Sequence, residues 1–122
     1  MVKVAIVDDS AAVQASLSRL LAQNPAIEIV GFAEDVAGAN AMIERSNPDV
    51  VVLDVELRNN DTSMPVLRFL RERLPATRVI VLSNSTWGSL RAGFLATGAE
   101  AYFDKSTEFL EARDWIAALV GR

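Results

Sequence analysis

Five short apolar runs, none long enough for a core helix, recur along this chain and alternate with longer stretches of helical spacing. Short runs of Val, Ile and Leu are typical of strands buried on both faces of a parallel sheet. The expected strands are residues 2–7, 27–33, 50–53, 78–82 and 101–103. Because parallel crossovers are right-handed, five such units predict a doubly wound α/β domain with helices on both faces of the sheet. The flavodoxin-like strand order 2-1-3-4-5 is expected.

The helices between these runs have recognisable ends. Two Asn-Pro pairs stop the first two helices, because proline cannot continue the backbone hydrogen-bond ladder. The other residues expected at helix ends are the caps Ser10, Asp35 and Ser106, the first-turn residue Pro65 and the left-handed end residue Gly98. On the last helix, Leu110 and Trp115 fall outside the apolar stripe. One of them is a candidate partner contact, although single exposed apolar residues are ordinary.

At 122 residues and 51% hydrophobic content, the chain holds one domain with a substantial core. A net charge of -4 provides no basic surface for direct binding to nucleic acid or to an anionic membrane. The amino terminus is unlike a signal peptide, and no segment approaches the roughly 18 apolar residues of a membrane span, so a cytoplasmic protein is expected. Cysteine and histidine are both absent. Thiol chemistry is therefore excluded, and any phosphohistidine must belong to a partner.

Charged residues stand where three of the apolar runs stop. Asp8 and Asp9 follow the first run, Asp54 follows the third, and Lys105 stands just past the fifth. In an open parallel sheet, ligands bind beyond the carboxyl ends of the strands. Because the expected order places the first and third strands side by side, the three aspartates should converge.

Converging carboxylates require a counter-charge, and hard oxygen ligands favour a divalent cation, for which Mg²⁺ is the natural candidate. Mg²⁺ needs only a couple of protein carboxylates, which leaves one carboxylate free to act as a nucleophile. An aspartate can attack phosphorus to give an acyl phosphate, while the metal and a lysine neutralise charge on the transferring oxygens. The pattern therefore predicts phosphoryl transfer.

In these motifs and their joint spacing, the chain resembles a receiver domain of bacterial two-component response regulators, of the chemotaxis-regulator kind, from about residue 2 to residue 120. The resemblance implies that Asp54 is the phosphoacceptor and that Asp9 binds Mg²⁺ directly, with Asp8 assisting partly through water. It implies that Asp54 and the backbone carbonyl of Glu56 are further metal ligands. By the same resemblance, the hydroxyl of Ser83 contacts the phosphoryl group.

Two more residues take roles by this resemblance. Lys105 matches the ion-pairing lysine of the family, and Tyr102 matches its switch aromatic, whose ring turns inward when the hydroxyl residue moves. The implied function is a switch and not an enzyme. It would take a phosphoryl group from a sensor histidine kinase or a histidine phosphotransfer protein and assist only its own phosphorylation and dephosphorylation. Residues 1–122 would form a single receiver domain without an effector domain, acting on a downstream protein target or serving an effector domain missing from this chain.

Plainer interpretations exist for each site residue. Asp8 and Asp9 fit a helix cap, Lys105 a surface lysine, Ser83 a turn residue and Tyr102 a static edge-strand aromatic. The alternative functions are a small phosphohydrolase of the haloacid dehalogenase type, a nucleotide- or flavin-binding module, and a degenerate receiver that only binds proteins. The sequence has no G-x-G-x-x-G and no Walker lysine motif, which disfavours nucleotide binding.

Three positions depart from the family pattern. Arg58 stands where proline is common, Asn84 where a very small residue usually follows the hydroxyl, and Ser106 where a cis proline usually follows the lysine. Without proline, the bond between Lys105 and Ser106 is expected to be trans. Glu56 and Asn84 flank the site, so we expect both to affect the lifetime of the phosphoryl group.

Overall fold

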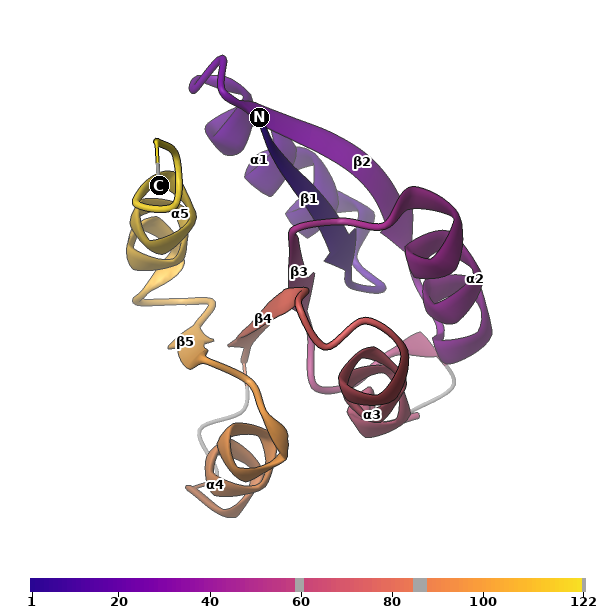
Figure 1. Ribbon diagram of the computed structural model, residues 1–122. Coiled ribbons are helices and arrows are strands. Elements are labelled where there is room, and N and C mark those ends of the chain that lie inside the picture. The colour runs from indigo at the N-terminus through magenta and orange to yellow at the C-terminus, as the bar shows by residue number, and fades with distance from the viewer. Residues whose placement is uncertain (59–60, 85–87, 122) are drawn as a thin grey trace.

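A computed structural model describes residues 1–58, 61–84 and 88–121 of this protein (Figure 1). The strands are β1 (Val2–Val7), β2 (Ile27–Ala33), β3 (Val50–Leu53), β4 (Arg78–Ser83) and β5 (Ala101–Asp104). The helices are α1 (Ala11–Ala22), α2 (Val36–Ser46), α3 (Met64–Arg73), α4 (Gly88–Thr97) and α5 (Phe109–Ala117). All strands pair in parallel in the order β2-β1-β3-β4-β5, so the predicted doubly wound α/β fold is confirmed.

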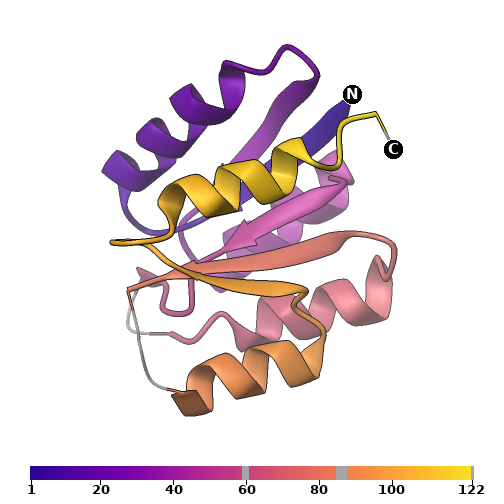
Figure 2. The same cartoon turned by 90° about the vertical axis from the view of Figure 1, so that its left-hand side faces the viewer.

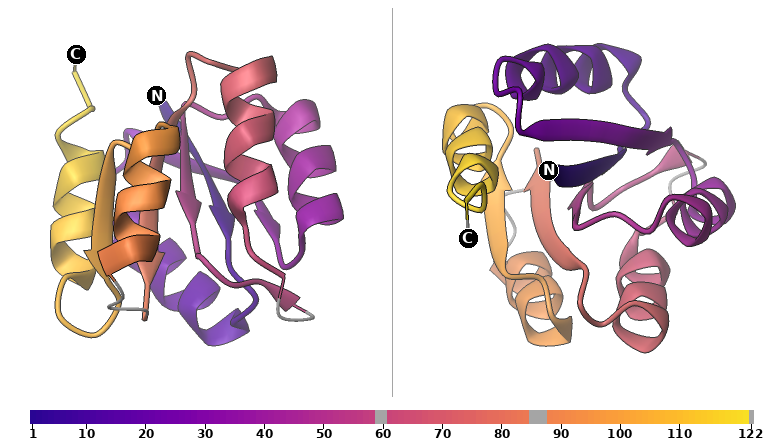
Figure 3. Two further views of the ribbon diagram at one scale, coloured as in Figure 1. Left: turned by 90° about the horizontal axis from the view of Figure 1, so that it is seen from below. Right: turned by 45° about the horizontal axis from the view of Figure 1, so that its top comes forward.

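Each central strand divides its side chains between two hydrophobic cores. Because successive side chains point to opposite faces, Val51 and Leu53 of β3 enter one core, whereas Val50 and Val52 enter the other. Helices α2, α3 and α4 cover the first face and α1 and α5 cover the second, as Figure 1 and the right-hand view of Figure 3 show. Burial on both faces explains why the central strands are continuous apolar runs.

Two of the three predicted caps form the expected hydrogen bonds. Ser10 Oγ accepts the N–H of Val13 at 3.2 Å, and Asp35 Oδ1 accepts the N–H of Gly38 at 2.7 Å. Pro65 lies in the first turn of α3, where its missing N–H leaves no bond unmade. These local signals set where α1, α2 and α3 begin.

Gly98 ends α4 in a conformation that requires glycine. Its φ is 121°, and a Cβ added there would lie 2.6 Å from Cδ of Arg71. The N–H of Gly98 donates to the carbonyl of Leu95 at 3.2 Å, and the N–H of Ala99 donates to the carbonyl of Phe94 at 3.0 Å. These two bonds form a Schellman motif, so the predicted left-handed end of this helix is confirmed.

The expected cap at Ser106 is wrong, because α5 begins only at Phe109. Asp104 Oδ1 accepts both the N–H of Ser106 at 2.7 Å and its hydroxyl at 2.6 Å, while the N–H of Asp104 donates to Glu108 Oε1 at 3.0 Å. The serine hydroxyl bonds back to Asp104 in this turn, and the residue at the N-cap position of α5 is Glu108. The bond between Lys105 and Ser106 is trans, as expected.

All strands point the same way, which gathers their carboxyl ends at one edge of the sheet, at the left of Figure 2. The two chain termini lie together at the opposite edge (Figure 2). Among the described residues, no helix has both the length and the apolar character that a membrane span requires.

Candidate functional site

Backbone hydrogen bonds extend the sheet one residue beyond three of its strands. The N–H of Asp8 donates to the last carbonyl of β2 at 3.0 Å, and the N–H of Asp54 donates to the last carbonyl of β1 at 2.9 Å. The N–H of Lys105 donates to the last carbonyl of β4 at 3.0 Å. The sheet itself therefore fixes the backbones of these three charged residues along its carboxyl edge.

Lys105 reaches two of the carboxylates directly. Its Nζ lies 2.6 Å from Oδ2 of Asp8 and 3.0 Å from Oδ2 of Asp54. The lysine side chain is only 9% exposed, so its interpretation as an ordinary surface lysine is wrong. The sequence predicted a metal as the counter-charge for the aspartates, but the lysine already supplies part of it.

Burial and the lysine charge act in opposite directions on Asp54. Burial raises the pKa of Asp54 to about 6, the ammonium of Lys105 opposes this rise, and the neighbouring Asp8 carboxylate adds to it. Burial alone would lower the pKa of Lys105, but its hydrogen bonds and charge interactions with the two aspartates raise that pKa above its ordinary value. At neutral pH, Asp54 is therefore mainly ionised, as a nucleophile must be, and Lys105 is a cation.

Asp9 completes a cluster of oxygen donors. One ligand atom from each of Asp8, Asp9 and Asp54 lies within 4.8 Å of the others, with Asp8 and Asp54 buried and Asp9 exposed. Three carboxylates against one ammonium give this cluster an excess of acidic groups and a net negative charge. Hard oxygen donors and this net charge fit a divalent cation such as Mg²⁺.

The helix-cap interpretation of Asp8 and Asp9 is wrong, because Ser10 caps α1. Asp8 Oδ1 instead accepts the N–H of Ser10 at 2.9 Å, in a turn that precedes the helix. Gln14, in the second turn of α1, donates from Nε2 to the backbone carbonyl of Asp8 at 2.7 Å. Sequence analysis missed Gln14, because a glutamine on a helix gives no signal of where its amide will reach. The loop that carries both aspartates is thus held from the sheet and from the helix.

Glu56 lies in a loop that two antiparallel backbone hydrogen bonds close. The N–H of Leu57 donates to the carbonyl of Asp61 at 2.7 Å, and the N–H of Ser63 donates to the carbonyl of Val55 at 2.8 Å. Neither bond uses the carbonyl of Glu56, which is the expected metal ligand. The described residues on the two sides of this loop are therefore paired with each other, although proline is missing at position 58.

Four of the predicted site residues line one open cavity of about 360 Å³, together with Asn84. Its lining consists of Asp9, Asp54, Glu56, Ser83 and Asn84. Ser83 is buried at the end of β4, whereas Glu56 and Asn84 are exposed at the rim. Residues from the ends of β1, β3 and β4 thus face the same space, which has room for a small anionic group beside the carboxylates.

Tyr102 lies next to this site in β5 and is 7% exposed. The guanidinium of Arg91 in α4 lies 5.8 Å from the centroid of its ring, and Arg91 Nη1 donates to its backbone carbonyl at 3.1 Å. The ring packs into the core beneath α4, so it is inward in this structure. A switch role and a static role both fit this position, and the switch role stays a prediction.

The sequence matches the response regulator receiver domain family over residues 4–116. The chain belongs to this family. The match runs from β1 into α5 and includes both the acidic cluster and Lys105. It decides in favour of a receiver domain of two-component signalling over the phosphohydrolase and nucleotide-binding alternatives.

Curated relatives of this receiver domain are longer proteins. The chain is 35% identical over 111 residues to the DNA-binding transcriptional activator DevR/DosR of Mycobacterium tuberculosis, an alignment that covers 91% of the chain and 51% of the relative. It is 40% identical over 101 residues to a protein-glutamate methylesterase/protein-glutamine glutaminase of Koribacter versatilis, covering 83% of the chain and 27% of the relative. The receiver domain thus spans about half and about a quarter of these two proteins.

Solved receiver domains share the fold over nearly the whole chain. The signal receiver domain of the putative response regulator NarL from Mycobacterium tuberculosis superposes with a TM-score of 0.86 at 25% identity, covering 99% of this chain and 98% of that one. The response regulator domain of Thermotoga maritima CheB superposes with a TM-score of 0.82 at 25% identity, covering 98% and 92%. The described fold is therefore that of solved receiver domains from two different response regulators.

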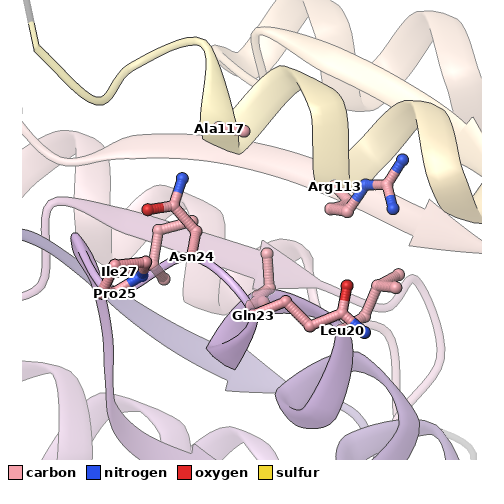
Figure 4. A pocket seen from close by; sticks show the side chains of 8 residues that line it. Leu20, Gln23, Asn24, Pro25, Ile27, Arg113 and Ala117 are labelled. Atoms are coloured by element: carbon pink, nitrogen blue, oxygen red, sulfur yellow. The ribbon is translucent and has the colours of Figure 1, made fainter.

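A second hollow of the receiver domain lies between the end of α1 and α5 (Figure 4), and it shares no lining residue with the cavity beside the acidic cluster. Leu20, Leu21, Ile27 and Ala117 give it an apolar lining, and Arg113 contributes its charged side chain. None of its lining residues is acidic, so it offers no carboxylate to a metal or a phosphoryl group. The chemistry therefore belongs to the carboxyl edge of the sheet.

The two apolar side chains outside the stripe of α5 differ in their exposure to solvent. Of the two residues off the apolar stripe of α5, Leu110 is 53% exposed, whereas Trp115 packs against the core beneath α1 and α5. Leu110 is therefore the better candidate for a partner contact, which stays a prediction. Trp87, Ser85 and Thr86, which the sequence places after Ser83, lie outside the described residues.

Proposed function

We propose that this receiver domain accepts a phosphoryl group on Asp54 from a phosphohistidine of a partner protein. The observation that carries the proposal is the Asp54 carboxylate, held 3.0 Å from the Lys105 ammonium beside two further aspartates at the carboxyl edge of the sheet. An oxygen of Asp54 attacks phosphorus, a P–O bond forms, and the P–N bond to the partner imidazole breaks. Because this chain has no histidine, the donor histidine lies outside it, in a sensor kinase or a phosphotransfer protein by this proposal.

The chain's own residues prepare this carboxylate for attack. The N–H of Val55 donates to Asp54 Oδ1 at 2.8 Å, while Lys105 donates to Oδ2, so the carboxylate plane is fixed from two sides. Transfer of the phosphoryl group brings more negative charge to the same position. Lys105, already a buried cation, offsets that charge and pairs with the product.

A divalent cation, Mg²⁺ by the chemistry of the donor set, would be held by Asp8, Asp9 and the backbone carbonyl of Glu56, next to Asp54. When bound, it neutralises charge on the transferring oxygens. The exposure of Asp9 provides access for the ion from solvent, and the burial of Asp8 keeps its carboxylate oriented.

Phosphorylation of Asp54 would act on the rest of the domain through Ser83 and Tyr102. Contact between the phosphoryl group and the Ser83 hydroxyl would favour one of two arrangements of the surface formed by α4, β5 and α5. The domain turns over only its own acyl phosphate, which it loses to water. Because its relatives carry further sequence, the output is either a downstream protein or an attached effector domain, such as the DNA-binding or methylesterase functions named for those relatives.

The test is incubation with acetyl phosphate or beryllofluoride, with and without Mg²⁺. Wild type should incorporate phosphoryl groups in a Mg²⁺-dependent manner, measured by intact mass, and Asp54→Asn should incorporate none. Asp114→Asn is the matched control, because it makes the same chemical change at an exposed position on α5. Incorporation that persists in Asp54→Asn, or that ignores Mg²⁺, would contradict the proposal.

A further inference from the structure

Arg58 and Glu34 join two loops at the carboxyl edge of the sheet. The backbone N–H of Arg58 donates to the backbone carbonyl of Glu34 at 3.1 Å. Its guanidinium also forms an ion pair with the Glu34 carboxylate. We call this double contact the loop clasp. It connects the loop after β3, which carries Glu56, with the loop after β2.

Both ends of the clasp rest on fixed backbone. On one side, Glu34 lies between the last residue of β2 and Asp35, which caps α2. On the other side, Val55 and Leu57 are each 2% exposed and anchor the residues around Glu56 in the core. Arg58 follows Leu57 directly, so the clasp restrains the chain two residues after Glu56.

The clasp depends on Arg58 not being proline. Proline restricts its own φ but has no N–H, so it cannot donate to the carbonyl of Glu34 and has no charge to pair with the carboxylate. The receiver pattern commonly has proline at this position. Here a hydrogen bond and an ion pair supply the restraint that a pyrrolidine ring would otherwise give.

We propose that the loop clasp positions the backbone carbonyl of Glu56 for the divalent cation, with Arg58 and Glu34 acting as positioning residues. This inference rests on the proposed metal site. Because the ion pair is about half exposed, with side chains 56% and 39% accessible, its contribution is modest. We expect its loss to weaken cation affinity by about threefold.

General electrostatics makes the opposite prediction for one of the two partners. Removing the positive charge of Arg58 would by itself strengthen binding of a cation, and removing the negative charge of Glu34 would weaken it. A clasp predicts weaker binding in both cases, because either change removes the ion pair and leaves the same loop held only by the backbone hydrogen bond. The sign of the Arg58→Ala effect therefore separates positioning from charge.

The experiment measures Mn²⁺ affinity by the electron paramagnetic resonance of free Mn²⁺, with Mg²⁺ as competitor, and metal-free stability by urea unfolding. Arg58→Ala, Glu34→Ala and the double variant should each bind about threefold more weakly than wild type, without additivity, and Arg58→Lys should recover most of the affinity. Arg73→Ala is the matched control, because it breaks another exposed ion pair, with Glu44 at 3.4 Å, away from the site. It should change affinity by less than about 1.5-fold.

The clasp proposal is overturned if Arg58→Ala binds as tightly as wild type or more tightly, or if Arg73→Ala weakens binding as much. It is also overturned if the loss of affinity merely follows a loss of metal-free stability. Failure of the metal site itself gives a different result. In that case wild type binds no cation, or Asp9→Asn binds as wild type does.

Discussion

Charged residues are arranged differently at the two edges of the sheet. At the amino edge each acidic residue has a partner of its own: Glu100 pairs with Arg78 at 3.0 Å, with side chains 38% and 45% exposed, and Asp49 accepts the backbone N–H of Lys3 at 2.8 Å. At the carboxyl edge, the single ammonium of Lys105 serves two buried carboxylates, and a third lies beside them. The amino edge needs no ligand, whereas the carboxyl edge retains negative charge that a cation can stabilise.

The largest expected difference between the two edges is in stability. Lys105→Met removes the partner of two buried carboxylates, and breaking a buried pair costs about 3 kcal/mol. Arg78→Met breaks an exposed pair and should cost less than about 1 kcal/mol. Urea unfolding in EDTA measures both free energies. Equal losses of unfolding free energy in Lys105→Met and Arg78→Met would show that the ion pairs at the two edges contribute equally to stability.

Metal removal provides the second test of this comparison. Binding of Mg²⁺ to the folded state alone should raise the free energy of unfolding by about 2.7 kcal/mol at a concentration one hundred times Kd, and EDTA should abolish this gain. Asp9→Asn should lose most of the stabilisation because it removes the negative charge of an exposed carboxylate. Asp49→Asn, at the amino edge, should keep it. Thermal or urea unfolding with and without Mg²⁺ measures this stabilisation in both variants. An equal loss of Mg²⁺ stabilisation in Asp9→Asn and Asp49→Asn would contradict a metal site at the carboxyl edge.

The fold could be predicted from the sequence because its strands are buried on both faces. The first three strands have the predicted bounds, since their apolar runs end at charged or small residues. The start of α5 could not be predicted. Ser106 is a good cap in isolation, but its N–H and its hydroxyl both donate to Asp104. Glu108 in turn accepts the N–H of Asp104, and the resulting turn delays the start of the helix to Phe109.

The candidate site was predictable to the extent that it follows from topology. Strand order alone brings Asp8, Asp54 and Lys105 to one edge. The contacts that restrain their loops depend on how far a side chain reaches in three dimensions. Neither the bond from Gln14 to the carbonyl of Asp8 nor the contact of Arg58 with the loop after β2 has a sequence pattern of its own.

The smallest expected effects belong to the exposed rim of the cavity. Glu56 and Asn84 both line the cavity that Asp54 faces, and a directly placed group contributes on the order of 1 kcal/mol, or about fivefold in rate. Asn84→Ala should speed the loss of the phosphoryl group, because a smaller side chain opens the cavity to water. Glu56→Ala should slow it, because the carboxylate can orient the attacking water.

The rate of dephosphorylation after removal of acetyl phosphate measures both effects, and Glu100→Ala at the amino edge is the matched control for Glu56→Ala. The control should leave the rate unchanged, since its carboxylate lies at the other end of the strands. Rates within about twofold of wild type for both rim variants would mean that water reaches the acyl phosphate without passing either side chain. In that case Asp54, Lys105 and the bound cation alone would set the lifetime of the signal.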